Sequence, residues 1–214
     1  MNRLIPVLLA LAFPLAACGG DDGDGSPDSP DASVNDPADA AGPDADPASF
    51  CTNLAPSYGA LGALTGTAEV APLDDKDPNG PKVLTLKMAV NADATPDVLF
   101  AELYEGEPPF EGGFAPGTYT ISGLQADVIA CSVCVYLAAD FMMGQPIDFH
   151  MASSGSVEIT SVDPTPDTGS IAGTLTGLSL RQVTVSQQGQ MVVPMGCRTS
   201  IDSVSFDLQV TAAQ

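Results

Sequence analysis

Short apolar segments separated by turn-forming residues recur between residues 50 and 214 of this 214-residue chain. Four of these segments alternate apolar and polar residues or are rich in β-branched residues, as β-strands are: 82–90, 117–121, 156–162 and 203–210. Groups of Pro, Gly, Asn and Asp, such as residues 77–80, separate them. Many short strands joined by such turns predict an all-β domain, an antiparallel β-sandwich with a barrel as the alternative.

Two further segments are ambiguous. Residues 97–105 follow Thr95-Pro96, a possible helix start, but their apolar side chains alternate and Gly106 ends the run. This pattern favours a strand. Residues 170–186 contain two glycines and predict one long strand with a bend or bulge, or two shorter strands.

The first eighteen residues have the pattern of an export signal. Asn2 and Arg3 precede an apolar run, residues 4–15, which is too short to cross ~30 Å of hydrocarbon as a helix. The run ends in Leu15-Ala16-Ala17-Cys18, which resembles the lipobox of bacterial lipoproteins. The resemblance implies that residues 1–17 are removed as a signal peptide and that Cys18 is lipidated on its sulfur and on its new amino group.

The same resemblance implies a location. Two or three acyl chains on one residue hold a protein on a membrane durably, whereas a single chain binds only marginally. By analogy with enterobacterial lipoproteins, Gly19 after the lipidated Cys implies the outer membrane. The acidic run 21–24 is similar to signals that place some lipoproteins on the cell surface. We therefore expect a lipid anchor in the outer membrane, on its periplasmic side or at the cell surface.

Residues 18–49 predict a disordered tether. Residues 19–49 contain nine Asp, no Lys and no Arg, and little besides Gly, Pro, Ala and Ser. Such a segment cannot bury enough apolar surface to offset its ordering entropy. Its Pro spacing and mutual charge repulsion favour an extended chain, which would reach ~90 Å at the polyproline rise. The folded domain is therefore expected within residues 50–214.

The net charge restricts the possible partners. The chain has six Lys and Arg against 27 Asp and Glu, for a formal charge of -21. Such a charge repels phosphate backbones and anionic lipid headgroups. We expect no nucleic-acid partner and no attachment through a basic patch, and we expect the lipid anchor to provide the membrane contact.

Four cysteines remain after Cys18: Cys51, Cys131, Cys134 and Cys197. An even number in an exported protein implies two disulfides, with three possible pairings. In a strand over residues 128–137, Cys131 shares the more apolar face with Val133, whereas Cys134 lies on the opposite face. Residues three apart in a strand are ~10 Å apart, beyond the ~7 Å Cα limit of a disulfide. We therefore expect Cys131 and Cys134 to pair with Cys51 and Cys197, not with each other.

The Cys131-Ser132-Val133-Cys134 motif also has a redox interpretation. Thiol oxidoreductases place the first Cys at a helix N-terminus, and no such helix is predicted here. Zinc would need four reduced thiols, which an oxidising compartment disfavours. Haem attachment needs His after the second Cys, where Val135 stands. Structural disulfides are the favoured interpretation.

A weak calcium site is possible at Asp75, Asp77 and Asn79, which offer oxygen atoms at alternate positions before Gly80. A complete helix-flanked calcium loop places Glu at its twelfth position, where this chain has Leu86. A turn rich in Asp and Asn is the favoured interpretation. No other cofactor is expected.

Two other features are candidates for function. His150, the single histidine, has Ser153, Ser154 and Asp148 nearby in sequence, but we expect it to face solvent on a strand over 147–151. The loop 105–117 carries Phe110 and Phe114, which would either contact a partner or cover the core. Packing is the favoured role of these two aromatic side chains.

The sequence as a whole favours a lipid-anchored envelope or cell-surface lipoprotein with a non-catalytic domain that binds an unidentified envelope partner or has a structural role. The hairpin sequence at 155–160 and 169–175 resembles that of small β-sandwich lipoproteins of unknown function. The alternatives are an envelope hydrolase that uses carboxylates or a metal and, less favoured, a thiol-disulfide oxidoreductase.

Overall fold

The computed structural model describes residues 51, 53–141, 148–186 and 189–213, and these residues form an all-β domain, as predicted. In chain order the elements are β1 (Ala60–Leu64), β2 (Gly66–Pro72), β3 (Lys82–Ala89), β4 (Val98–Tyr104), β5 (Gly117–Ile121), the 3₁₀-helix η2 (Gly123–Ala126), β6 (Val133–Ala139), β7 (Asp148–Val162), β8 (Ser170–Ser186), β9 (Gly189–Val192) and β10 (Arg198–Ala212). The expected signal peptide 1–17, Cys18 and the tether 18–49 lie outside the described residues. Among the described helices, none has the length and apolar character needed to cross a membrane.

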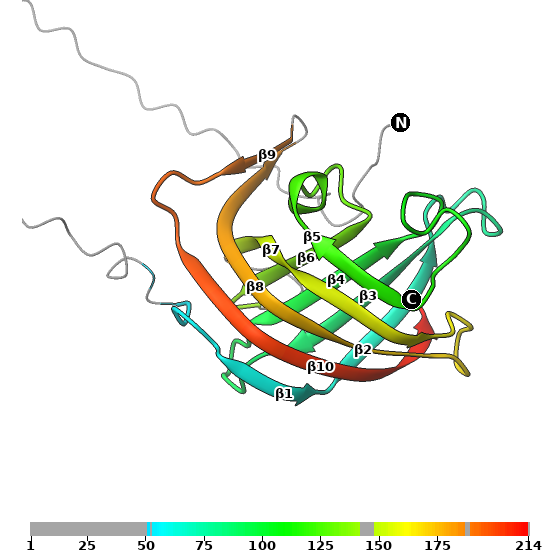
Figure 1. Ribbon diagram of the computed structural model, residues 1–214, viewed down its shortest axis with the longest axis horizontal. Helices are drawn as coiled ribbons and strands as arrows, with labels where there is room; N and C mark the ends of the chain where they lie inside the picture. Colours follow the sequence, from blue (N-terminus) through cyan, green and yellow to red (C-terminus); the bar gives the residue numbers. More distant parts are fainter. Residues whose placement is uncertain (1–50, 52, 142–147, 187–188, 214) are drawn as a thin grey trace, which may run out of the picture. The chain divides into compact units, whose positions relative to one another are not determined.

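One large sheet encloses the core (Figure 1). Its strands follow the order β1-β10-β2-β3-β4-β6-β7-β8-β9, and β5 pairs with β7. Because β10 also pairs with β8, the strand path returns on itself and the sheet folds over, so that opposite walls pack against each other as in a sandwich. The sheet is mixed, because β1 and β2 both run parallel to β10 while the other pairs are antiparallel. β1 and β2 are separated only by Thr65, and both pair with β10 in the same direction.

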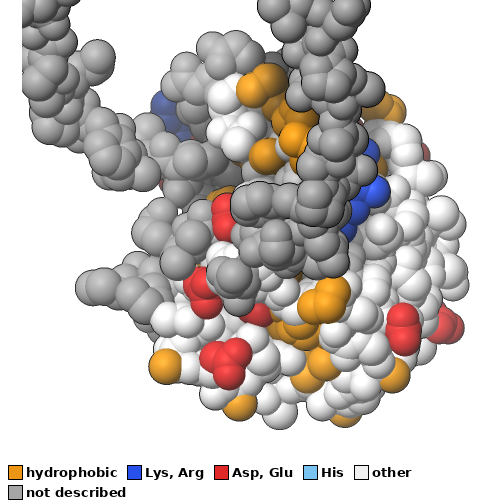
Figure 2. Space-filling view, turned by 90° about the vertical axis from the view of Figure 1, so that its left-hand side faces the viewer, with side chains coloured by type: hydrophobic (Ala, Val, Ile, Leu, Met, Phe, Trp, Pro, Cys, Tyr) orange, Lys and Arg blue, Asp and Glu red, His pale blue; other side chains and the backbone are white. Residues whose placement is uncertain are grey.

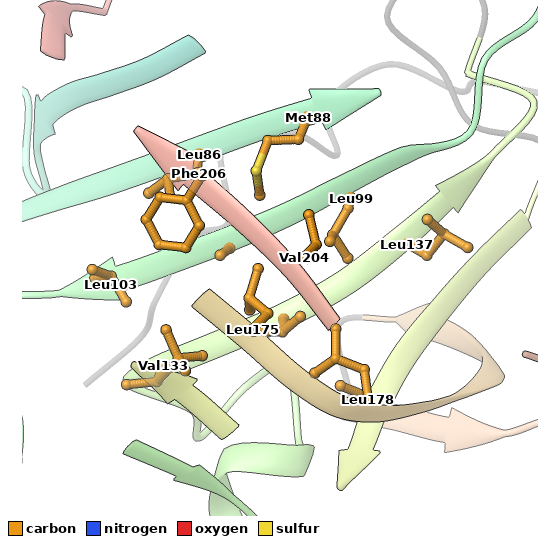
Figure 3. Close-up of a cluster of buried hydrophobic side chains, with 14 of the residues drawn as sticks. Leu86, Met88, Leu99, Leu103, Val133, Leu137, Leu175, Leu178, Val204 and Phe206 are labelled. Carbon is orange, nitrogen blue, oxygen red and sulfur yellow. The ribbon is translucent and has the colours of Figure 1, made fainter. Parts of the chain in front are cut away.

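The core is filled by side chains at alternate strand positions. On β3, the side chains of Leu84, Leu86 and Met88 are almost completely buried, and the residues between them are partly exposed. Apolar side chains from β3, β4, β6, β8 and β10 converge on one cluster (Figure 3): Leu86, Met88, Leu99, Leu103, Val133, Leu137, Leu175, Leu178, Val204 and Phe206. This cluster is the main source of stability, because apolar burial gives roughly 25 cal/mol per Å².

The two ambiguous segments are strands. Residues 98–104 form β4, which is buried on both faces for most of its length. Residues 170–186 form the single long strand β8, with Gly177 in the left-handed region at φ 61°. A glycine adopts this conformation without steric cost, which explains the bend within one strand.

An aromatic cluster lies on the outer face of β4, β6 and β7. Phe100 stacks on Tyr136 with ring centroids 4.9 Å apart, and Phe141 packs edge-on against Phe100 at 5.7 Å. Phe149 extends the cluster, 5.7 Å from Tyr136. Burial raises the pKa of Tyr136, and the neighbouring Glu102 raises it further. This part of the sheet is therefore apolar on both faces.

Candidate functional site

The cysteines pair differently from the prediction. Cys51 is bonded to Cys197 and Cys131 to Cys134, with Cα atoms 5.6 Å and 5.3 Å apart. The expected pairing of Cys131 and Cys134 with the other two cysteines is wrong. Strand β6 begins only at Val133, and the backbone amides of Ala130 and Cys131 both donate to the carbonyl of Asp127. This turn curls the chain and brings the two cysteines together.

The predicted faces are correct for strand β6 and for Cys134, but the placement of Cys131 on the core face is wrong. Val133, Val135 and Leu137 belong to the main core. Cys134 lies on the other face with Cys131, and both are completely buried beside Met151 and Val183. The Cys131–Cys134 bond therefore lies under an apolar cover and not at a helix N-terminus.

Asp75, Asp77 and Asn79 lie in the exposed turn between β2 and β3. The turn is held by its own groups, because the Lys76 amide donates to Asp74 Oδ1 at 2.9 Å and the Gly80 amide to the Asp77 carbonyl at 3.0 Å. In the described ranges, no three His, Cys, Asp or Glu side chains are grouped so that they could hold a metal ion. Calcium binding at this turn stays a prediction.

Phe110 and Phe114 pack, as the favoured interpretation predicts. Phe110 is completely buried in the main core, and its ring centroid is 5.7 Å from that of Phe114 and 4.8 Å from that of Tyr119. Phe114 is partly buried against the same core. The surface beside this loop carries a shallow hollow of about 350 Å³, lined by Pro108, Pro109, Thr118, Tyr119, Thr120, Gln125 and Val133.

His150 is buried, and the expectation that it faces solvent is wrong. Only 1% of its surface is exposed. Its neighbours Phe149 and Met151 belong to the outer apolar cluster, so the alternation of β7 turns His150 and Ala152 toward the main core. Its cross-strand partners are Leu137 on β6 and Gln182 on β8.

Asp97 organises the polar groups on one side of this histidine. Its carboxylate accepts hydrogen bonds from the Tyr58 hydroxyl, from Asn91 Nδ2 at 2.9 Å and from the Asp140 amide at 2.9 Å. Asp97 is only 3% exposed. Its own amide donates to Asn91 Oδ1. These bonds join the N-terminal segment, the β3–β4 connection and the end of β6.

Asp148 organises the other side. Its carboxylate accepts a hydrogen bond from Gln182 Nε2 at 2.7 Å and one from Asn53 Nδ2 at 3.2 Å. The Cys197 amide in turn donates to Gln182 Oε1 at 3.1 Å. The network therefore reaches the Cys51–Cys197 disulfide. We call the set Tyr58, Asp97, Asp148, His150 and Gln182 the polar end of the core.

Two groups at the polar end are favoured in their neutral forms, the imidazole of His150 and the phenol of Tyr58. Neither ring nitrogen of His150 has a hydrogen-bond partner among the described residues. Burial lowers the pKa of His150, and the nearby carboxylates of Asp148 and Asp97 oppose this shift. Burial raises the pKa of Tyr58, and its hydrogen bond to Asp97 raises it further.

The serine hydroxyl two residues beyond Met151 takes part in the hydrogen bonding of the sheet. The nearby Ser153 hydroxyl donates to the Ser179 carbonyl, at 3.0 Å. The sequence pointed to His150 with Asp148 nearby, but not to Tyr58, Asp97 and Gln182, which complete its surroundings. Comparison of the chain with family models, with curated proteins and with solved structures finds no match.

Lowering the pH should destabilise the wild-type protein more than a His150→Leu variant. The folded-state pKa of His150 lies below its usual 6.5, so the unfolded chain takes up a proton first. This contribution to the free energy of unfolding is present above pH 6.5 and is lost as the pH falls from there toward the lower folded-state pKa. Urea unfolding between pH 7 and about pH 5 measures the slope. Equal slopes in the two proteins would contradict this assignment.

Proposed function

We propose that this chain is a lipid-anchored lipoprotein of the bacterial outer membrane whose β-domain has a binding or structural role without catalysis. The observation that carries the proposal is the lipobox-like Leu15-Ala16-Ala17-Cys18 followed directly by the acidic segment 19–49. Acyl chains on Cys18 would hold the chain on the periplasmic side of the membrane or at the cell surface. The disulfides support an exported protein, because such bonds persist in oxidising compartments.

The polar end supports a role without catalysis. Catalytic groups must contact the substrate, but His150 and Asp97 are buried and Asp97 is already engaged by three donors. The convergence of two carboxylates near His150 is the observation that favours the alternative, an envelope hydrolase. Their burial weighs against it. The buried Cys131–Cys134 disulfide likewise disfavours a thiol oxidoreductase, because exchange requires an attacking thiolate to reach a sulfur atom.

Metabolic labelling with radioactive palmitate tests the lipid anchor. The full chain expressed in a bacterium should incorporate label and partition with the membrane fraction. A Cys18→Ser variant should incorporate none, because it lacks the acceptor sulfur, and should keep residues 1–17. A wild-type protein that stays unlabelled, or is recovered from the cytosol with its cysteines reduced, would refute the proposal.

A further inference from the structure

One long stretch of this acidic chain has no acidic residues. Residues 168–201 contain no Asp or Glu, although the whole chain has 27 of them, and they contain Arg181 and Arg198. This stretch includes all of β8 and β9 and the start of β10. The net charge of the protein therefore does not describe this part of its surface.

Arg181 and Arg198 lie directly opposite each other in the β8–β10 register. Their neighbours Leu180 and Thr199 are buried, so both arginines project from the outer face. Neither has an ion-pair partner among the described residues, and Arg181 Nε is buried without a hydrogen-bond partner there. Like charges placed opposite each other destabilise a sheet. An anion between the two guanidinium groups would remove this repulsion.

Exposed apolar side chains lie beside these arginines in the chain. Met191, Val192 and Met195 are 66%, 41% and 94% exposed. Ile129, which is 40% exposed, lies next to β9, because a Cβ on Gly189 would be 3.7 Å from Ile129 Cδ1. Large apolar side chains grouped in this way at a surface are typical of interaction sites.

Met195 is unfavourable for folding in two respects. It occupies the third position of the turn closed by the Gly196 amide and the Val193 carbonyl, at 3.0 Å, with φ 56°. Gly or Asn is preferred at this position, because a side chain strains the left-handed backbone. The Met195 side chain is also almost fully exposed, so it adds nothing to the core. A strained, exposed apolar residue is better explained by a contact outside the domain.

The point at which the acidic segment joins the domain indicates which partner these residues contact. Arg198 follows Cys197, which is bonded to Cys51, the residue at which the acidic segment meets the domain. Figure 2 faces the side on which β9 lies in Figure 1; the basic side chains seen there lie above most of the acidic ones, and apolar side chains lie near them as well as lower on this face. A membrane-anchored segment that ends here would tether the domain on this side, within the ~90 Å that the extended segment could span.

We propose that Ile129, Arg181, Met191, Val192, Met195 and Arg198 form a membrane-contact surface, here called the β9 surface. The apolar side chains enter the boundary between headgroups and acyl chains, and the two guanidinium groups bind lipid phosphate groups. The acidic remainder of the domain faces away from the lipid. The delivery of this surface to a membrane rests on the proposed lipid anchor, whereas its affinity for lipid does not.

Vesicle sedimentation of residues 18–214 carrying Cys18→Ser tests the surface without any acyl chain. This protein should bind vesicles of phosphatidylethanolamine and phosphatidylcholine. M191S/M195S should lower the partition coefficient at least about tenfold, and R198Q should lower it about tenfold through loss of a charge-assisted bond. Leu73→Ser and Lys76→Gln, in the β2–β3 turn, are matched controls that should change nothing. Unchanged melting temperatures of all variants exclude misfolding.

Two further measurements test whether the surface recognises the phosphate group of a lipid. Vesicles of an uncharged galactolipid, which lacks phosphate, should bind the wild type and R198Q equally. Free glycerol phosphate should compete only weakly, since it offers no apolar boundary. No binding to phosphate-containing vesicles, or equal binding by M191S/M195S, would overturn the proposal. The protein used for sedimentation carries no acyl chain, so a failure to bind vesicles would not bear on the palmitate labelling of Cys18. Likewise, absent labelling of the full chain would not bear on the vesicle result.

Discussion

Replacing Cys51 and Cys197 together by Ala should lower the free energy of unfolding by about 5 kcal/mol. The two residues are 146 positions apart, so the bond closes a loop of most of the domain in the unfolded chain. The same chain-entropy relation gives about 2 kcal/mol for the Cys131–Cys134 bond, whose residues are only three positions apart. Urea unfolding of C51A/C197A and C131A/C134A under non-reducing conditions measures both effects.

The location of the long-range disulfide adds to its effect. Asn53 and Tyr58 lie close behind Cys51 in the chain and donate to Asp148 and Asp97. Release of Cys51 would therefore loosen the segment that covers the polar end. The Cys131–Cys134 pair serves as the internal control, because it is more deeply buried but closes a much shorter loop. A larger loss of stability in C131A/C134A would show that packing around the sulfurs, not loop closure, determines the contribution of each bond.

The strands that were predicted share one property that the missed strands lack. Segments such as 82–90 and 203–210 combine large apolar residues with strict alternation, and they form β3 and β10. Half of the residues of β1 and β2 are Ala or Gly, and β9 has four residues. Their strand conformation comes from pairing with β10, β3 and β8, and this pairing cannot be inferred from short, weakly apolar segments.

The errors at His150 and the cysteines have separate physical causes. His150 was expected to face solvent, but its apolar neighbours Phe149 and Met151 belong to the outer cluster and His150 faces inward. Where both faces of a sheet are apolar, the alternation of polar and apolar residues no longer shows which face points to the core. The cysteine error arose because a strand was predicted over residues 128–137, whereas residues 128–130 form a turn and β6 begins only at Val133. Asp148 and His150, two residues apart, did share one strand face, which was a usable signal for the polar end.

Asp97→Ala should lower the free energy of unfolding by about 4 kcal/mol, because it leaves buried donors without an acceptor. The Tyr58 hydroxyl, Asn91 Nδ2 and the Asp140 amide all donate to this carboxylate. Tyr58→Phe removes one donor and should cost about 1 kcal/mol. Asp207→Ala on the exposed face of β10 is the control and should change stability by less than about 0.5 kcal/mol.

The double variant D97A/Y58F distinguishes a network from independent contacts. Its cost should be smaller than the sum of the two single costs, because removal of the Tyr58 hydroxyl also removes one of the donors orphaned by Asp97→Ala. Urea unfolding of the four proteins at pH 7 completes the cycle. Additive costs would mean that Tyr58 and Asp97 stabilise the domain separately. A coupled pair would instead mean that the segment after Cys51 is fixed by this carboxylate as well as by the disulfide.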